Sequence, residues 1–116
     1  MQTIYDYPPT PRGDTVDALQ ITLTWDDTGS PVSLLSSVIR CHFRECSPDG
    51  PVVYRADLTT GITIVDAANG VFRVDEFIAN FPKAGTYYYD TEVVTNEGYK
   101  TTPVTGTLDL TADVTR

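Results

Sequence analysis

Hydrophobic and polar residues alternate in seven short runs along this chain of 116 residues. Alternation with a period of two predicts a strand that has one buried face and one exposed face. In the first run, Leu19, Ile21 and Leu23 alternate with polar residues, so their side chains are expected in the core. The expected strands are residues 18–25, 37–44, 52–57, 62–65, 71–75, 85–95 and 100–110.

Residues that favour turns separate these runs. Residues 26–31 read Asp-Asp-Thr-Gly-Ser-Pro, and residues 47–51 read Ser-Pro-Asp-Gly-Pro. Strands therefore arrive about every ten residues, a spacing typical of an all-β sandwich or barrel. We interpret the chain as an antiparallel β-sandwich.

The last two runs are expected to form the closing hairpin of the sandwich. Tyr87 and Tyr89 share their parity with Val93, which predicts that both tyrosines face the core. A tyrosine near a sandwich corner commonly bonds its hydroxyl to nearby backbone. Tyr88 has the opposite parity and is expected on the outer face.

Residues 75–81 carry the one segment with helical spacing. Phe77, Ile78 and Phe81 recur at that spacing, and Pro82 would end a helix there. We therefore expect at most one short helical turn, placed between the two sheets.

The first thirteen residues follow neither period. Tyr5 and Tyr7 precede Pro8, Pro9 and Pro11, a composition that predicts an extended, polyproline-like arm. We therefore divide the chain into an arm over residues 1–13 and a sandwich domain over residues 14–116. Tyrosine rings suit docking onto another chain, and we expect the arm to be dispensable for folding. The alternatives are a flexible N-terminal segment and an arm that folds back on its own domain.

Composition narrows the classes of partner. The chain has a net charge of −8 and only 8 lysines and arginines, which argues against nucleic acid and against an anionic membrane surface. No apolar run is long enough to span a bilayer, and no leader peptide is recognised at the N-terminus. Cys41 and Cys46 have opposite parity, so we expect no disulfide between them.

The sequence offers little for catalysis or metal binding. His42 is the single histidine, and its spacing from Cys41 and Cys46 does not match a zinc site. Asp90 and Glu92 share a strand face without a predicted cleft, so we interpret them as a solvated face. We expect no enzyme activity, no catalytic residue, no cofactor and no metal.

Three tyrosines outside the expected core, Tyr54, Tyr88 and Tyr99, are candidates for an exposed contact face. Tyrosine presents an apolar ring together with a polar hydroxyl, which suits contact with a carbohydrate or with a protein. The residues alone leave both partners open.

Several motifs follow one another in a familiar order. They are Arg12-Gly13-Asp14-Thr15, a strand ending in Trp25, Gly29-Ser30-Pro31-Val32-Ser33-Leu34, Val38 to Arg44, Gly61-Ile62-Thr63-Ile64, Gly70-Val71-Phe72, Gly85 to Val93 and Gly106-Thr107-Leu108. In this order they resemble a small immunoglobulin-like module of structural proteins of tailed bacteriophages and prophages, similar to the N-terminal domain of phage baseplate upper proteins. The resemblance covers most of the chain from about residue 12 onward.

The resemblance implies an immunoglobulin-like sandwich of about seven strands and a non-enzymatic role in the virion. The expected function is an adaptor or assembly module in the tail, baseplate or fibre attachment region, folded in the bacterial cytoplasm before assembly. The expected partners are other virion structural proteins and copies of the chain itself. The alternatives are a capsid decoration (cement) protein and a carbohydrate-binding module for host surface glycans.

Overall fold

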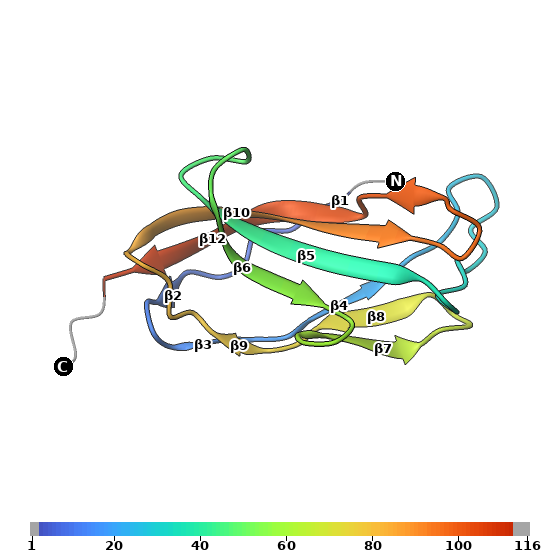
Figure 1. Cartoon of the computed structure of the whole chain (residues 1–116), viewed down its shortest axis with the longest axis horizontal. Helices are drawn as coiled ribbons and strands as arrows, with labels where there is room; N and C mark the ends of the chain where they lie inside the picture. The colour runs from blue at the N-terminus through green and yellow to red at the C-terminus, as the bar shows by residue number, and fades with distance from the viewer. Residues whose placement is uncertain (1–2, 113–116) are drawn as a thin grey trace.

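The computed structural model describes residues 3–112, which form two layers of β-strands (Figure 1). The larger sheet contains β1 (Thr3–Ile4), β2 (Thr10–Pro11), β5 (Val38–Glu45), β6 (Val52–Asp57), β10 (Gly85–Val94), β11 (Lys100–Thr101) and β12 (Val104–Thr111). Its main strand order is β1-β12-β10-β5-β6, with β2 beside β12 and β11 beside β10.

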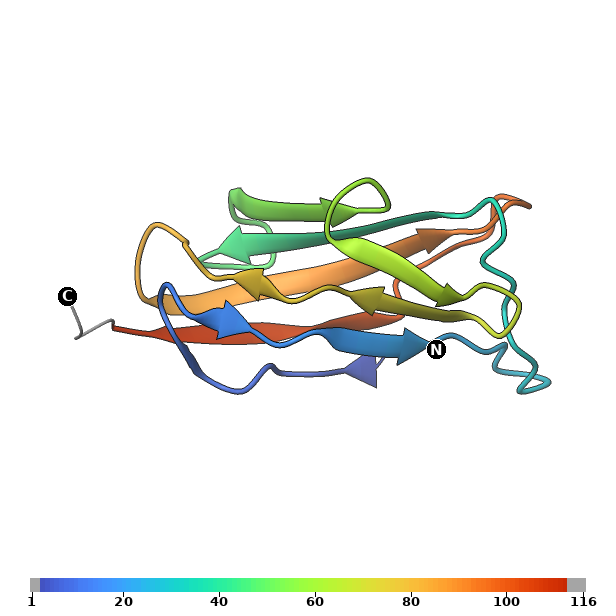
Figure 2. The same cartoon turned by 90° about the horizontal axis from the view of Figure 1, so that it is seen from below.

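The second layer contains two short ladders. One has the order β4-β8-β7, formed by β4 (Leu19–Thr22), β8 (Val71–Val74) and β7 (Ile62–Asp66). The other pairs β3 (Thr15–Val16) with β9 (Phe77–Ile78). Figure 2 shows β3 in line with β4 and β9 in line with β8, so the two ladders continue one another along the sandwich. The predicted all-β sandwich is confirmed.

Residues 75–81 do not form the short helical turn that their spacing suggested, since the described part of the chain contains no helix. Phe77, Ala79 and Phe81 are buried, whereas Ile78 and Asn80 are exposed. This alternation is the period of a strand, and Phe77 and Ile78 pair with β3 as β9. The helical spacing arose because Ile78 is apolar although its side chain is 65% exposed.

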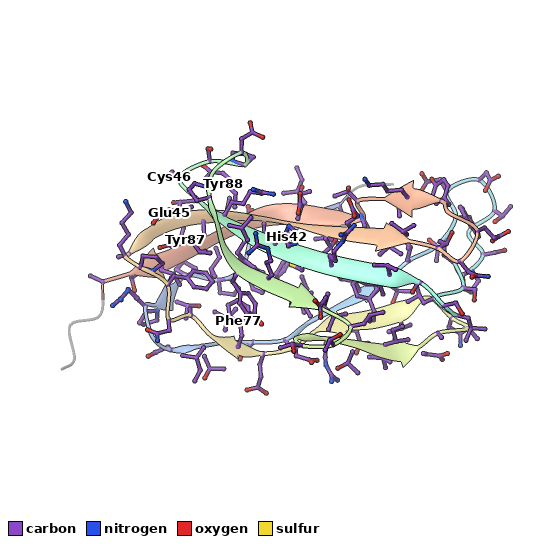
Figure 3. The ribbon with its side chains drawn as sticks, in the orientation of Figure 1. His42, Glu45, Cys46, Phe77, Tyr87 and Tyr88 are labelled. Carbon is purple, nitrogen blue, oxygen red and sulfur yellow. The ribbon has the colours of Figure 1, made fainter. Side chains whose placement is uncertain are left out.

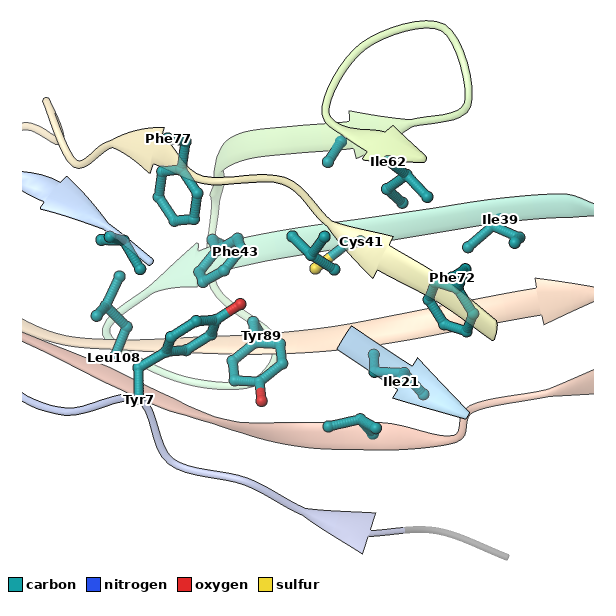
Figure 4. Packing of buried hydrophobic residues seen from close by; sticks show 14 of the residues in the cluster. Tyr7, Ile21, Ile39, Cys41, Phe43, Ile62, Phe72, Phe77, Tyr89 and Leu108 are labelled. Carbon is teal, nitrogen blue, oxygen red and sulfur yellow. The ribbon is translucent and has the colours of Figure 1, made fainter. Parts of the chain in front are cut away.

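An aromatic cluster joins the two layers (Figure 4). Phe43 on β5 lies at its centre, with its ring stacked on Tyr89 at 5.1 Å and edge-on to Phe77 at 5.2 Å. The rings of Tyr7, Tyr54 and Phe81 also lie within 6.1 Å of Phe43. Tyr87 and Tyr89 are 1% and 3% exposed, as their parity predicts.

Tyr87 forms the hydrogen bond expected of a sandwich corner. Its hydroxyl donates to the Lys83 carbonyl at 2.6 Å and accepts from the Lys83 N–H at 3.3 Å. These bonds tie the segment before β10 to the start of that strand, an arrangement typical of immunoglobulin-like sandwiches.

The closing hairpin is interrupted at Pro103, between β11 and β12. At this break the buried Thr91 hydroxyl accepts from the Val104 N–H at 3.1 Å and donates to the Val104 carbonyl at 3.0 Å. A side chain thus satisfies backbone groups at the point where the strand pairing breaks.

The N-terminal arm lies on its own domain, so the folded-back alternative describes this structure. Thr3 and Ile4 pair in parallel with Val104 and Thr105 of β12, and Tyr7 is only 5% exposed. We now expect removal of the arm to destabilise the sandwich, because it would take a large aromatic ring out of the core.

Two buried tyrosines differ in how their hydroxyls are satisfied, which gives a matched test. We expect Tyr87→Phe to lower the free energy of unfolding by about 1–2 kcal/mol, because it removes the bond to Lys83. Tyr7→Phe is expected to leave stability unchanged or raise it, since the Tyr7 hydroxyl is buried without a partner among the described residues. Urea denaturation of both variants measures the difference, and equal losses would contradict it.

Candidate functional site

The three tyrosines predicted to form an exposed contact face lie in different places, so that prediction is wrong. The Tyr54 ring stacks on Phe77 at 4.6 Å inside the aromatic cluster. Tyr99 packs edge-on against Trp25 at 5.0 Å, beyond the end of β10. Only Tyr88 lies on the outer face of the larger sheet. Tyr54 points inward because it pairs with the buried Phe43 and shares its parity with the buried Ala56.

The predicted arm residues divide into one anchor and an exposed remainder. Tyr7 is buried in the core, whereas Tyr5, Pro8, Pro9 and Pro11 are exposed. The Tyr7 ring therefore offers no surface to a partner while the arm is docked.

A groove of about 350 Å³ on the outer face of the larger sheet is the best candidate for a binding site. Strand register brings its parts together, since Thr105 of β12 lies opposite Asp90 of β10, which in turn lies opposite His42 of β5. Figure 3 labels two of its residues, Tyr88 and His42. We call this the outer groove; its lining is Ile4, Asp6, His42, Arg44, Pro48, Tyr88, Tyr89, Asp90, Thr105, Gly106 and Thr107.

The loop between β5 and β6 bounds one side of the outer groove (Figure 3). Arg44 holds this loop by donating from its guanidinium to the Gly50 carbonyl at 2.9 Å. Cys46 adopts a φ of 72°, in the left-handed region that most residues avoid. These features place Pro48 over the end of the sheet beside Tyr88.

The arm bounds the other side of the outer groove. The Asp6 carboxylate accepts from the Thr107 N–H at 3.0 Å and from the Thr107 hydroxyl at 3.1 Å. Ile4 is 74% exposed and lies next to Thr105 in the register of β1 and β12. The groove thus combines an apolar side chain, a tyrosine ring and carboxylates.

Basic side chains surround His42 at the floor of the groove. Partial burial lowers the pKa of His42, and the positive charges of Arg55, Arg44 and Arg40 lower it further, although Asp90 opposes them. Near neutral pH, His42 is therefore the uncharged member of a basic row along β5, with Arg55 opposite it on β6.

Glu92, on the same face of β10 as Asp90, belongs to an ion-pair network. Partial burial opposes ionisation of Glu92, but hydrogen bonds from Arg40 and Lys100 outweigh this effect and lower the pKa of Glu92. The Lys100 ammonium lies 3.4 Å from the carboxylate. These charges give the outer face beyond the groove a solvated, polar character.

The two cysteines are free, with Cys41 buried and Cys46 exposed. Burial strongly raises the pKa of the Cys41 thiol, which keeps it protonated and unreactive. Over residues 3–112, no group of three or more His, Cys, Asp or Glu side chains is arranged to hold a metal ion. In the same residues no helix has the length and apolar character needed to cross a membrane.

A comparison with models of protein families finds no match to this chain, and a comparison with curated proteins also finds none. The functional argument therefore depends on the site itself and on the motif order of the sequence.

Sequence reasoning placed part of the outer groove and missed the rest. Alternation placed Tyr88 on the outer face and Asp90 on a solvated face, and both residues line the groove. It missed Asp6, because nothing in the sequence signals that the arm pairs in parallel with β12.

His42 makes the stability of the fold depend on pH. Its pKa is lower in the folded than in the unfolded protein, so its contribution to stability is complete above the unfolded pKa of about 6.5 and is lost as pH falls from that value through the lower folded pKa. We expect the free energy of unfolding to fall less steeply between pH 7.5 and pH 5.5 in His42→Gln than in the original protein. Denaturation curves across this range measure both slopes, and a His42→Gln slope as steep as the original would contradict the assignment.

Proposed function

We propose that this protein is a non-enzymatic structural protein of a tailed bacteriophage virion, acting as an assembly module in the tail, baseplate or fibre attachment region. The observation that carries the proposal is the order of motifs from Arg12 to Leu108, whose resemblance to phage structural modules covers most of the chain. The immunoglobulin-like sandwich agrees with that resemblance but is shared by many unrelated proteins.

The outer groove supplies a mechanism for assembly. Tyr88 and Ile4 give its lining apolar surface, while Asp6, Asp90 and Arg44 give it charged groups. A protein contact commonly buries apolar surface of this kind, and the charged groups near it fix the orientation of the partner. In this proposal a neighbouring virion subunit inserts a side chain beside Tyr88, and the rigid sandwich holds that contact in place.

Particle assembly tests the function directly. The protein should be present in purified particles, and labelling should locate it on the tail; labelling on the head would favour the capsid decoration alternative. Absence of the protein from washed, infectious particles would overturn a virion role of either kind.

The Tyr88→Ala variant tests the groove. We expect its incorporation into particles to fall at least tenfold, because the substitution removes the aromatic ring at the centre of the contact. Val65→Ala is the matched control, since Val65 is exposed on β7 in the other layer. Equal incorporation of both variants, measured by quantitative immunoblotting, would contradict a contact at the groove.

A carbohydrate-binding module is the second candidate, favoured because Tyr88, Asp6 and Asp90 line the same groove. Sugars stack on aromatic rings and bond to carboxylates. Tyr54 and Tyr99 cannot extend this platform, because they lie elsewhere. Binding of the isolated protein to host surface glycans, lost in Tyr88→Ala, would favour this candidate over the structural one.

A further inference from the structure

The docked arm is held by few interactions. Of residues 3–11, Tyr7 alone is buried. Three backbone N–H groups of the arm donate to carbonyls of the facing strand at 2.8–2.9 Å: Thr3 to Pro103, Tyr5 to Thr105 and Tyr7 to Thr107. The Asp6 hydrogen bonds to Thr107 and the two-residue pairing of β2 add to this attachment, which is still short compared with the long antiparallel ladders of the same sheet.

Two features weaken the attachment further. Pro8 and Pro9 have no N–H to donate, so the pairing with β12 is interrupted between β1 and β2. The buried Tyr7 hydroxyl has no partner among the described residues, which opposes burial of the ring. The same prolines keep the released segment extended, so the arm does not collapse onto its own domain when it opens.

The site that receives the arm is specific. The Tyr5 carbonyl accepts a hydrogen bond from the Tyr89 hydroxyl at 2.6 Å. It also lies so close to Gly106 that a Cβ at that position would approach its oxygen to 1.8 Å. Tyr7 then places its ring 5.1 Å from that of Tyr89. When the arm leaves, β12 becomes an unpaired edge beside an open aromatic cavity.

We propose that the arm is exchanged between two copies of this chain, so that residues 3–7 of each copy pair with β12 of the other and each Tyr7 fills the other copy's cavity. The exchanged pair repeats the contacts of residues 3–7, whereas the pairing of β2 with its own β12 opens to form the bridge, so exchange is opposed by that loss and by the entropy of association. The five residues from Pro8 to Arg12 span about 17 Å when extended, which bridges two copies whose β12 edges face each other. The proposal concerns the free protein and does not depend on the virion role.

Cysteine cross-linking between two different variants tests the exchange. Ile4 and Thr105 are paired in the register of β1 and β12, and both positions are accessible from the outer groove. One chain carries Ile4→Cys and the other carries Thr105→Cys, each with Cys46→Ser so that no exposed native thiol remains. The two chains are mixed, incubated, oxidised and separated on a denaturing gel without reductant.

We expect a covalent heterodimer whose yield rises with protein concentration, because the disulfide joins the arm of one copy to β12 of the other. Two controls set the background. Replacing Thr105→Cys by Val65→Cys, at an exposed position in the other layer, should reduce the yield at least tenfold. Adding Gly106→Ala to both chains should do the same, because its Cβ displaces the Tyr5 carbonyl.

One chain that carries both Ile4→Cys and Thr105→Cys shows whether this pair of positions can form a disulfide at all. If that chain closes within itself at low concentration while the mixed chains give no more heterodimer than the Val65→Cys control, the proposal is overturned. If the double variant does not form this disulfide, sedimentation of the original protein tests the exchange instead. A protein that remains monomeric up to about 1 mM excludes exchange, since tethered neighbours in an assembly meet at comparable effective concentrations.

Discussion

The packing of aromatic rings around Phe43 is the interaction on which the rest of this structure depends. Phe43 belongs to β5, and the rings around it come from the arm, from β6, from β9, from the segment that leads into β10, and from β10 itself. The second layer contains only short strands, so hydrogen bonding within it is limited. Contact between rings of the two layers therefore fixes how the layers sit together.

This packing also determines which surface is free for partners. Because Tyr87 and Tyr89 point inward to the cluster, Tyr88 between them must point outward, where it meets Arg44 across β5 and Thr107 across β12. Tyr54 points inward as well, since it pairs with Phe43 and shares the parity of the buried Ala56. The outer groove is thus a consequence of the core: the same alternation that fills the interior leaves one tyrosine on the outer face.

The sequence predicts this fold where the physical signal is local. The strand positions, the parity of Tyr87 and Tyr89 and the hydroxyl bond at the corner all follow from alternation and turn residues. No helical turn forms at 75–81, where Ile78 is apolar yet exposed and so imitates a helical period in the sequence. The docked position of the arm has no local signal in the sequence. Its parallel pairing with β12 joins residues about a hundred positions apart and depends on the close approach at Gly106.

The arm links the core to the candidate site. Tyr7 packs into the aromatic cluster, while Asp6 and Ile4, on either side of Tyr5, line the outer groove. Any event that releases Tyr7 from the core therefore also removes one wall of the groove. In an exchanged pair, each groove regains that wall from the other copy, so the surface offered to a third subunit is built from two chains.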